Sequence, residues 1–465
     1  MELLQTIFVF VVVLSILVTV HEFGHFIAAR LTGMRVETFA VGMGNRLFGY
    51  NKVTGFTFGS LKENDERAAV EAGYTDYRVS MLPIGGYVKI SGMIDESMDD
   101  SYTKTAPQPH EFRSKNAAQK LLVMTAGVIM NIVLAVLIFA GITFGEGKTV
   151  LTTTTVAFVE KNSVFEQAGL RAGDNIVSVN ATKVQSWNDL SSLIMAKYIG
   201  EDRTLLVERT EQGKTSTVPI VVSDKTITDA LAAQHSVMTE IMPVGSAVMI
   251  TGVESLKPAG KLGLLVGDTL VSINGVPVHS SSQLVETIKA NIGKEVALEW
   301  KRGGSQMSGL VVPDNDGRIG IGIAPVFRGE MRRQQYGLLE SFAIGTQEMI
   351  AMCKAQVAAI GQLFKGKASF KQSVGGPIMI AKTSKQAADL GFTALLRFTA
   401  LLSIVLAIMN ILPFPALDGG HVVVILIEAI IRREMPVKVK MAIQQIGVVM
   451  LLGFMVFVVY NDLTR

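Results

Sequence analysis

The sequence of 465 residues has a single cysteine, Cys353, and only six histidines. One cysteine excludes an internal disulfide framework, and it also excludes a zinc site built from several cysteines. Metal ligands in this chain, if there are any, must therefore be histidine, aspartate or glutamate.

Charged residues are also scarce. They make up 18% of the chain, against about a quarter in soluble domains, while 49% of the residues are hydrophobic. The net charge of +3 is small for this length, and no basic run is interleaved with aromatic residues. These features predict a membrane protein and no nucleic-acid partner.

Crossing the apolar core of a bilayer, about 30 Å thick, takes about 20 mostly apolar helical residues. We predict spanning helices at residues 1–31, 116–145, 393–431 and 441–460. The first has no basic N-terminal region and no small-residue cleavage site. We therefore interpret it as a retained span rather than a signal peptide.

The third predicted span is interrupted by the run NILPFPALDGG at residues 410–420. Pro413 and Pro415 each lack a backbone N–H, and two glycines follow Asp418. Broken backbone at membrane depth is stable only where it is buried in protein or lines a cavity. The interruption therefore needs a structural or functional reason.

The polar stretch between the second and third spans contains a repeat. AGLRAGDNIVSVN at residues 168–180 returns as KLGLLVGDTLVSING at residues 261–275, and Gly173–Asp174 aligns with Gly267–Asp268. A Gly-Asp turn, a strand, a loop and a helix follow one another in both copies, and this order resembles the circularly permuted PDZ domain of bacteria. We assign PDZ domains to residues 149–224 and 236–327, with an unrelated small β-rich domain as the alternative.

Residues 337–392 have an apolar stripe that glutamate, glutamine and lysine interrupt in its first part. This pattern predicts an amphipathic juxtamembrane segment that lies at the membrane surface and does not cross it.

Near the end of the first span, residues 21–25 read H-E-x-x-H. Residues i and i+4 share one face of a helix, so His21 and His25 can bind one zinc ion. Glu22 lies beside them, where it can take a proton from water. Ionisable residues in a membrane span cost free energy, so their presence indicates a function. The alternative is a pair of interfacial histidines that neighbouring polar groups satisfy.

Catalytic zinc usually has three protein ligands and one open position. The best third ligand is Asp418, an ionisable residue that would otherwise be stranded in apolar surroundings. One alternative is that Asp418 caps the helix that restarts after it. The rival ligand is His421. Three other histidines are expected at the surface: His110, His235 and His279.

H-E-x-x-H in a first span, N-x-x-P-x-P-x-L-D-G in a later span and PDZ domains between them closely resemble the site-2 proteases. The resemblance covers nearly the whole chain, including FAVGMG at 39–44, PIGGYVKI at 83–90 and TAGVIMN at 125–131. The tandem PDZ layout is similar to members from Gram-negative bacteria. Two features depart from the family: Val128, where many members have proline, and residues 51–76, which match no family motif.

The resemblance implies a multi-pass α-helical membrane protein with about four transmembrane helices. A membrane-associated β-hairpin region at residues 32–115 and two inserted PDZ domains complete the expected fold. One Zn²⁺ per chain would be held by His21, His25 and Asp418, with Glu22 as the general base. The activity would be intramembrane proteolysis.

The same resemblance implies that Asn410 holds the substrate backbone near the metal. The alternative is that Asn410 satisfies backbone groups opened by Pro413. The other predicted substrate contacts are Pro413 and Pro415 in the broken run, and Gly42, Gly44 and Tyr87 in the β region, which could offer an edge to an extended peptide.

The expected partners are the lipid bilayer and single-pass transmembrane substrates already trimmed outside the membrane, such as anti-sigma factors or signal-peptide remnants. The expected location is the bacterial inner membrane. Lys and Arg favour the cytoplasmic side, and they gather at residues 30–120 and 432–440. We therefore expect periplasmic termini and PDZ domains, with zinc nearer the cytoplasmic leaflet.

Two other classes of function stay open. A PDZ scaffold with a structural metal would usually need four ligands, and the sequence offers three good ones. A transporter could also use a broken helix, but many transporters have repeats within the membrane, whereas the clear repeat here is in the polar part.

Overall fold

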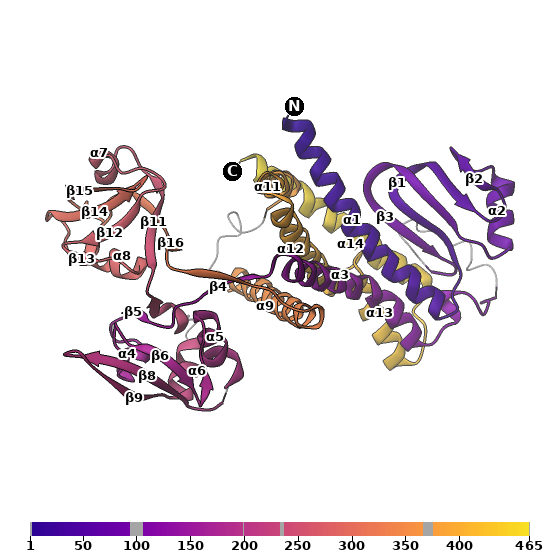
Figure 1. The fold of residues 1–465 in the computed structure, drawn as a ribbon. Helices are drawn as coiled ribbons and strands as arrows, with labels where there is room; N and C mark the ends of the chain where they lie inside the picture. Colours follow the sequence, from indigo (N-terminus) through magenta and orange to yellow (C-terminus); the bar gives the residue numbers. More distant parts are fainter. Residues whose placement is uncertain (1, 94–105, 199, 233–236, 366–374, 465) are drawn as a thin grey trace. The chain divides into compact units, whose positions relative to one another are not determined.

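The computed structural model describes residues 2–93, 106–198, 200–232, 237–365 and 375–464 (Figure 1). They form two compact units, one of Met1–Gly147 with Gln335–Arg465 and the other of Lys148–Gln334. The parts of the predicted segments at 94–105, 233–236 and 366–374, and with them His235, lie outside the described residues.

The first unit contains four described helices that are long and apolar enough to cross a membrane. They are α1 (Glu2–Leu31), α3 (Ala117–Glu146), α12 (Phe392–Ile411) and α14 (Val437–Leu463). Each falls within or around one of the four predicted spans. The third predicted span is divided, because α12 ends at Ile411 and α13 (Asp418–Ile431) begins only after the non-helical run 412–417.

Short-range turns satisfy much of the backbone in this break. The N–H of Phe414 donates to the carbonyl of Leu412 at 2.7 Å, and that of Leu417 donates to the carbonyl of Phe414 at 3.1 Å. A β-carbon at Gly419 would lie 2.1 Å from the carbonyl oxygen of Leu412. Glycine therefore allows α13 to begin close against the end of α12.

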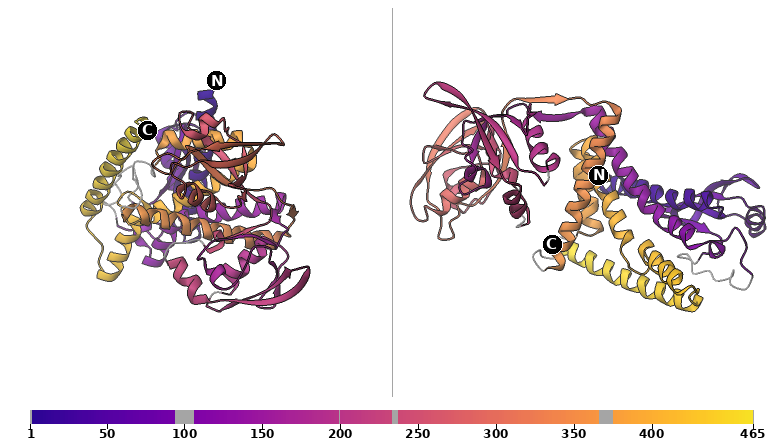
Figure 2. Two further views of the ribbon diagram at one scale, coloured as in Figure 1. Left: turned by 90° about the vertical axis from the view of Figure 1, so that its left-hand side faces the viewer. Right: turned by 90° about the horizontal axis from the view of Figure 1, so that it is seen from below.

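The segment predicted to lie at the membrane surface contains α9 (Leu338–Phe364) and α11 (Pro377–Asp389). Helix α9 is not a candidate span, but it lies beside α3 (Figure 2). A β-carbon at Gly345 would be 2.6 Å from the backbone nitrogen of Ala140, and Met349 packs on a core shared by α3 and α12. One side of α9 is thus packed against the bundle, and its depth in a bilayer stays a prediction.

The predicted β region is a bent sheet in the order β2-β1-β3. Its strands are β1 (Val36–Asn51), β2 (Gly55–Phe58) and β3 (Asp76–Ile90). Residues 38–41 of β1 pair with 76–79 on one side and with 86–89 on the other. Phe26 of α1 packs on this sheet against Phe39 and Tyr77, with ring centroids 5.4 and 5.9 Å away.

Residues 51–76, which match no family motif, add β2 and α2 (Glu63–Glu71) to this sheet. Asp76 joins the addition to the rest because its carboxylate contacts Arg46, Asn51 and Arg78 at 2.7–3.4 Å. Asp76 is 3% exposed. A buried carboxylate with three such donors is well compensated.

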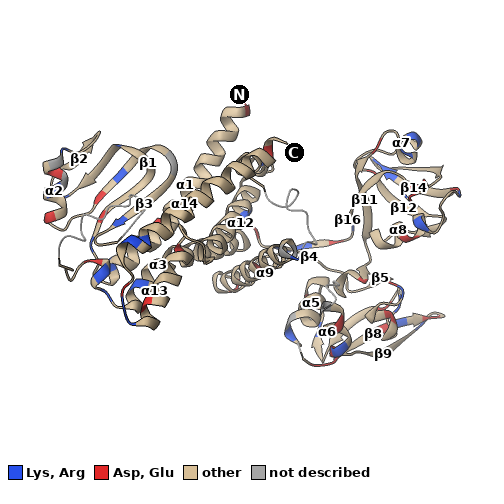
Figure 3. Ribbon diagram, turned by 180° about the vertical axis from the view of Figure 1, so that it is seen from behind, with Lys and Arg blue, Asp and Glu red and all other residues tan. Residues whose placement is uncertain are grey.

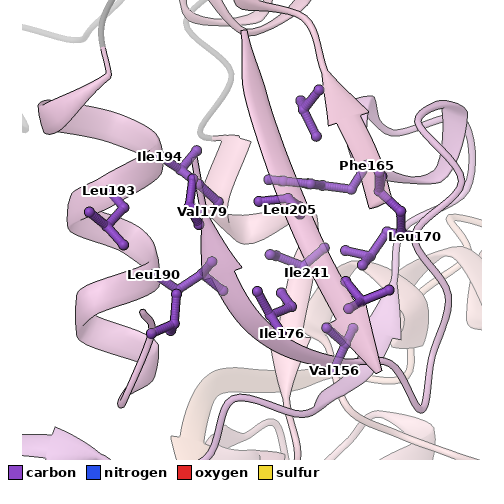
Figure 4. Close-up of a cluster of buried hydrophobic side chains, with 14 of the residues drawn as sticks. Val156, Phe165, Leu170, Ile176, Val179, Leu190, Leu193, Ile194, Leu205 and Ile241 are labelled. Carbon is purple, nitrogen blue, oxygen red and sulfur yellow. The ribbon is translucent and has the colours of Figure 1, made fainter. Parts of the chain in front are cut away.

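The first repeat of the second unit forms a sheet in the order β7-β6-β8-β9. Figure 4 shows its apolar core. The elements are β4 (Lys148–Leu151), β5 (Val156–Val159), α4 (Val164–Gln167), β6 (Asn175–Val179), β7 (Thr182–Lys183), α5 (Trp187–Ser192), η3 (Leu193–Lys197), β8 (Arg203–Glu211), β9 (Lys214–Val222) and α6 (Asp224–Ala232).

The next segment returns to this first core. Strand β10 (Ile241–Pro243) pairs with β5, and Val237 and Ile241 are buried in the first core. Strand β10 is therefore part of the first repeat, whereas the sequence pattern places residues 236–243 in the second. The long-range pairing with β5 has no local signal in the sequence, which explains the difference.

The second repeat has its own core under a sheet in the order β15-β14-β12-β11-β16, with β13 beside β12. The chain then returns to the start of the unit, where β17 pairs with β4. The elements are β11 (Ser246–Val253), α7 (Pro258–Leu262), β12 (Thr269–Ile273), β13 (Val276–Pro277), α8 (Ser281–Lys289), β14 (Val296–Arg302), β15 (Ser305–Val311), β16 (Ile321–Phe327) and β17 (Met331–Gln334).

The Gly-Asp pair that revealed the repeat makes the same contacts in both copies. Both carboxylate oxygens of Asp174 accept from Arg209 at 2.7 Å, and those of Asp268 accept from Arg302 at 2.7 Å. Each arginine also donates to a glycine carbonyl in the turn before its aspartate. These bidentate pairs hold the turn onto the neighbouring strand.

This pairing predicts a pH dependence of stability for the second unit. The hydrogen bond from Arg302 lowers the pKa of Asp268 below its ordinary value of 3.8. A lowered pKa in the folded state gives stability that is present above pH 4 and is lost as the pH falls. In thermal unfolding of residues 148–334, Asp268→Asn should lower Tm by a few degrees at pH 7, and the difference should shrink towards pH 3. The exposed Asp229→Asn is the control, and an equal effect of both variants contradicts the role of the pair.

Candidate metal centre

Three side chains from two distant parts of the sequence meet inside the first unit. The Nε2 atoms of His21 and His25 are 3.2 Å apart, and Oδ2 of Asp418 lies 3.0 and 3.4 Å from them. The histidines are 6% and 7% exposed. Among the described residues, these three form the one group of His, Cys, Asp or Glu side chains with the spacing of metal ligands.

These distances fit zinc. Zinc–ligand bonds of 2.0–2.2 Å in a tetrahedron place neighbouring ligand atoms about 3.3–3.6 Å apart. Oδ2 of Asp418 is buried and has no hydrogen-bond partner among the described residues, although two imidazole nitrogens lie beside it. A buried anionic oxygen in this position is well suited to a cation.

The alternative role of Asp418 as a helix cap is not what the geometry shows. The N-cap of α13 is Leu417, and no side-chain hydrogen bond caps this helix. Asp418 is instead the first residue of α13, and its carboxylate points to the two histidines of α1. The break before α13 therefore sets the place of the carboxylate.

Helix α3 packs against the rings of the two histidines. Val123, Gly127 and Asn131 are spaced four residues apart, and each faces the rings. A β-carbon at Gly127 would lie 2.5 Å from His25 Nε2 and 2.7 Å from His21 Nε2. On the other side of the contact, a β-carbon at Gly24 would be 2.3 Å from the carbonyl oxygen of Ala126. Two glycines thus allow α1 and α3 to approach closely at the site.

The Nδ1 atoms of both histidines face α3, away from Asp418. Nδ1 of His25 donates to the carbonyl of Val123 at 2.8 Å, and Nδ1 of His21 lies 3.1 Å from Nδ2 of Asn131. A hydrogen bond at Nδ1 orients the ring and turns Nε2 towards the metal position.

A cavity of about 530 Å³ opens beside the three ligands. Glu22 and His25 line it from α1, Asp418 lines it from α13, and Gly44 and Tyr87 line it from the sheet. The predicted general base, two of the three predicted ligands and two of the predicted substrate contacts therefore line one cavity. It is large enough for a short stretch of extended peptide.

The other predicted residues lie at different distances from this space. Asn410 lies against the ligand side of His21, with Nδ2 3.3 Å from Nε2. His421 lines the cavity but is not in the group of three. Pro415 lines a neighbouring cavity of about 240 Å³, and Gly42 and Pro413 line neither.

The two remaining described histidines are not in the group of three. His110 and His279 are partly buried. Nδ1 of His279 lies 3.3 Å from the carbonyl oxygen of Ser246 in the second repeat. Gly127 and Asn131, which lie against the two imidazoles, were not predicted as site residues. The available signal was a polar asparagine and a glycine four residues apart in an apolar span, within the motif TAGVIMN.

Known proteins resemble the chain over nearly its full length. The family model described as Peptidase family M50 matches residues 9–61 and 67–454. The chain is 30% identical to the "Putative zinc metalloprotease" of Vibrio cholerae, covering 100% of this chain and 99% of that protein. It is 29% identical to the regulator of sigma-E protease RseP of Escherichia coli, covering 98% of both.

Among solved structures, the PDZ domain of an SdrC-like protein from Listeria monocytogenes matches 16% of this chain and 85% of that chain. The sequence identity is 26% and the TM-score is 0.15.

Gly127, which lies against both imidazoles, gives a direct test of the metal centre. Gly127→Ala places a methyl group against both imidazoles, so we expect the zinc content of the purified protein to fall from about one per chain to a small fraction. Gly141→Ala is the matched control. It is on the same helix, but a β-carbon there meets no atom within 4 Å. Metal content is measured by mass spectrometry of elements. Equal zinc content in the two variants contradicts this position of the metal.

Proposed function

The chain belongs to peptidase family M50, and we propose that it cleaves peptide bonds within the membrane at a zinc ion held by His21, His25 and Asp418. The family and the relatives make it a zinc metalloprotease, in place of the scaffold or transporter alternatives. The triangle of two imidazole nitrogens and one carboxylate oxygen, 3.0–3.4 Å on a side, supports this ligand set.

Bound zinc supplies a Lewis acid that polarises a carbonyl and lowers the pKa of water. Glu22 acts as the general base in the proposed reaction. It follows His21 on α1 and lines the cavity with His25 and Asp418. Its carboxylate takes a proton from the attacking water and later returns it to the nitrogen of the leaving amine. The new carbon–oxygen bond forms first, and the carbon–nitrogen bond breaks when the protonated amine leaves.

Replacing Glu22 tests this role. Glu22→Gln keeps the size of the side chain but removes the base, so cleavage of a model transmembrane peptide should fall by about a hundredfold or more. Its zinc content should stay near one per chain. His25→Ala should lose both zinc and activity, whereas His421→Ala should keep its zinc. Cleavage by Glu22→Gln at the wild-type rate would falsify the assignment.

The substrate is proposed to bind as an extended strand along β3. Residues 86–89 of β3 pair with β1, and no described strand lies on their other edge. The same residues line the cavity next to Glu22 and His25. Strand addition there would satisfy the N–H and C=O groups of a substrate helix unwound for cleavage. Asn410, beside His21 Nε2, would hold one of these groups near the metal.

The two repeats are proposed to be periplasmic PDZ domains that admit only substrates already trimmed outside the membrane, anti-sigma factors among them. RseP of Escherichia coli is named as a regulator of sigma-E. The ends of the second unit meet, because Lys148 pairs with Gln334 between β4 and β17. The whole unit can therefore be excised with a short linker.

Excising the second unit tests whether the repeats select substrates or take part in catalysis. A chain with residues 149–333 replaced by a short Gly-Ser linker should bind zinc and should cleave untrimmed substrates that the full chain rejects. The readout is the ratio of cleavage rates for trimmed and untrimmed versions of one substrate. Loss of all cleavage in a folded, zinc-loaded deletion instead assigns the repeats to the catalytic machinery.

Charge supports the proposed orientation in a bacterial inner membrane. Lys and Arg gather where α1 and α13 end and where α3 begins (Figure 3). The cytoplasmic side of a membrane protein is the side rich in these residues. The N- and C-termini lie at the other end of the helices (Figure 1). We therefore propose that the metal centre is nearer the cytoplasmic leaflet and that both termini are periplasmic.

Cysteine accessibility tests this orientation in a Cys353→Ser background, which removes the one native thiol. A cysteine at Met435, in the loop before α14, should react with a membrane-impermeant reagent only after the inner membrane is opened. A cysteine at the exposed Asp316 of the second repeat should react from the periplasm. The reverse pattern rules out the proposed orientation.

A further inference from the structure

Two asparagines approach the ring of His21 from its two nitrogen atoms. Asn410 of α12 lies 3.3 Å from Nε2, on the side of the metal ligands, whereas Asn131 of α3 lies 3.1 Å from Nδ1, on the far side. Asn131 is 0% exposed. An amide buried this deeply in a membrane-spanning helix is costly unless its polar atoms have partners.

A neutral imidazole carries one proton and one lone pair on its nitrogens. If Nε2 of His21 offers its lone pair to a metal ion, the proton must be on Nδ1, and the group facing Nδ1 must accept a hydrogen bond. For His25 this acceptor is the backbone carbonyl of Val123. A backbone carbonyl can only accept a hydrogen bond, so it favours the Nδ1 proton whether or not a metal is bound.

At the equivalent place beside His21, the side chain of Asn131 faces Nδ1. The amide of Asn131 carries both a donor and an acceptor. Its Oδ1 is buried and has no hydrogen-bond partner among the described residues, while Nδ2 is turned to Nδ1. Rotation about the last side-chain bond exchanges the two atoms. The oxygen can then accept the Nδ1 proton.

We propose that Asn131 is the positioning residue for His21, with its amide oxygen accepting the Nδ1 proton whenever Nε2 binds the metal. This inference rests on the zinc site proposed above. The contact fixes both the tautomer and the plane of the ring. With the nitrogen turned to Nδ1, as the structure has it, the ring would instead carry its proton on Nε2, next to Asp418. In one orientation the amide of Asn131 accepts from a protonated Nδ1, and in the other it donates to an unprotonated Nδ1. It can therefore pair with His21 both with and without a metal at Nε2.

Two replacements with the same side-chain branching separate hydrogen bonding from packing. Asn131→Leu keeps the branched shape, although its methyl groups are larger, and removes the acceptor, so zinc affinity measured by competition with a chelating dye should fall by about 10–100-fold. Asn131→Asp keeps an acceptor beside Nδ1, so it should bind zinc at least as tightly as the wild type. A purely structural role predicts the opposite order, because an apolar leucine suits this helix contact better than a buried carboxylate.

A second readout follows the proton itself. In protein with ¹⁵N-labelled histidine, NMR of the zinc-loaded wild type should show His21 protonated at Nδ1, with slow exchange of that proton with water. Exchange should become faster in Asn131→Leu. Wild-type zinc affinity and unchanged exchange in Asn131→Leu overturn the proposal, even if Asn131→Asp does not fold.

Ser403→Ala is the control for the contact between α3 and α12. Its hydroxyl donates to the backbone carbonyl of Asn131 at 2.7 Å and does not contact His21. Zinc affinity should therefore be unchanged in this variant, and an equal loss there would assign the effect to helix packing. Asn410→Leu, on the ligand side, should reduce cleavage much more than zinc affinity.

His21→Ala distinguishes this inference from the ligand assignment beneath it. If His21→Ala keeps wild-type zinc affinity, His21 is not a ligand and the proposed zinc site is wrong. If His21→Ala loses zinc while Asn131→Leu keeps it, the zinc site stands and only the role of Asn131 is wrong.

Discussion

The close approach of α1 and α3 is the contact on which the metal centre depends. Two glycines permit it, one on each helix, because a β-carbon at Gly24 or Gly127 would lie within 2.7 Å of atoms of the other helix. In lipid, small residues let helices pack closely where no hydrophobic force drives them together. Here the same contact turns both Nδ1 atoms to α3 and leaves both Nε2 atoms for a ligand. Packing and ligand orientation are thus one interaction.

The broken helix carries Asp418, the proposed third ligand, and it also has to satisfy its backbone groups within the bilayer. An unwound segment leaves backbone groups that lipid cannot satisfy. Prolines at 413 and 415 remove two N–H groups, and local turns use others. A β-carbon at Gly447 would lie 2.4 Å from the carbonyl of Pro415, so α14 packs directly on the break. Asp418 is therefore held by a covered structure rather than by a flexible loop.

The β region and the repeats place further requirements on the same chain. The sheet rests on α1, where a β-carbon at Gly86 would be 3.5 Å from Cγ of Glu22. The proposed general base thus lies between the proposed metal ligands and the strand proposed to hold the substrate. The repeats form a separate unit with two cores of their own. Their Asp–Arg pairs need only a strand of the same repeat, which is consistent with a duplicated module.

The sequence by itself predicted the spans, the repeat and the histidine pair proposed to bind zinc. A helical period of 3.6 places His21 and His25 on one face whatever the rest of the chain does. The length of an apolar run similarly predicts a span. Asp418 and Asn410 were predicted through the broken motif and the family resemblance, since nothing local connects residues about 400 apart. The boundary between the repeats was misplaced because β10 pairs with a strand far back in the sequence.

Only the tertiary structure decided which residues of other helices contact the imidazole rings of the proposed ligands. Gly127 and Asn131 are ordinary residues of an apolar helix until α1 is packed against them, and no periodicity distinguishes a residue that contacts the rings from a neighbour that faces lipid. The packing of α9 along α3 and the cavity that joins Glu22 to Tyr87 were equally beyond the sequence. Local chemistry fixes what each residue can do. The contacts between segments far apart in the chain fix where it does so.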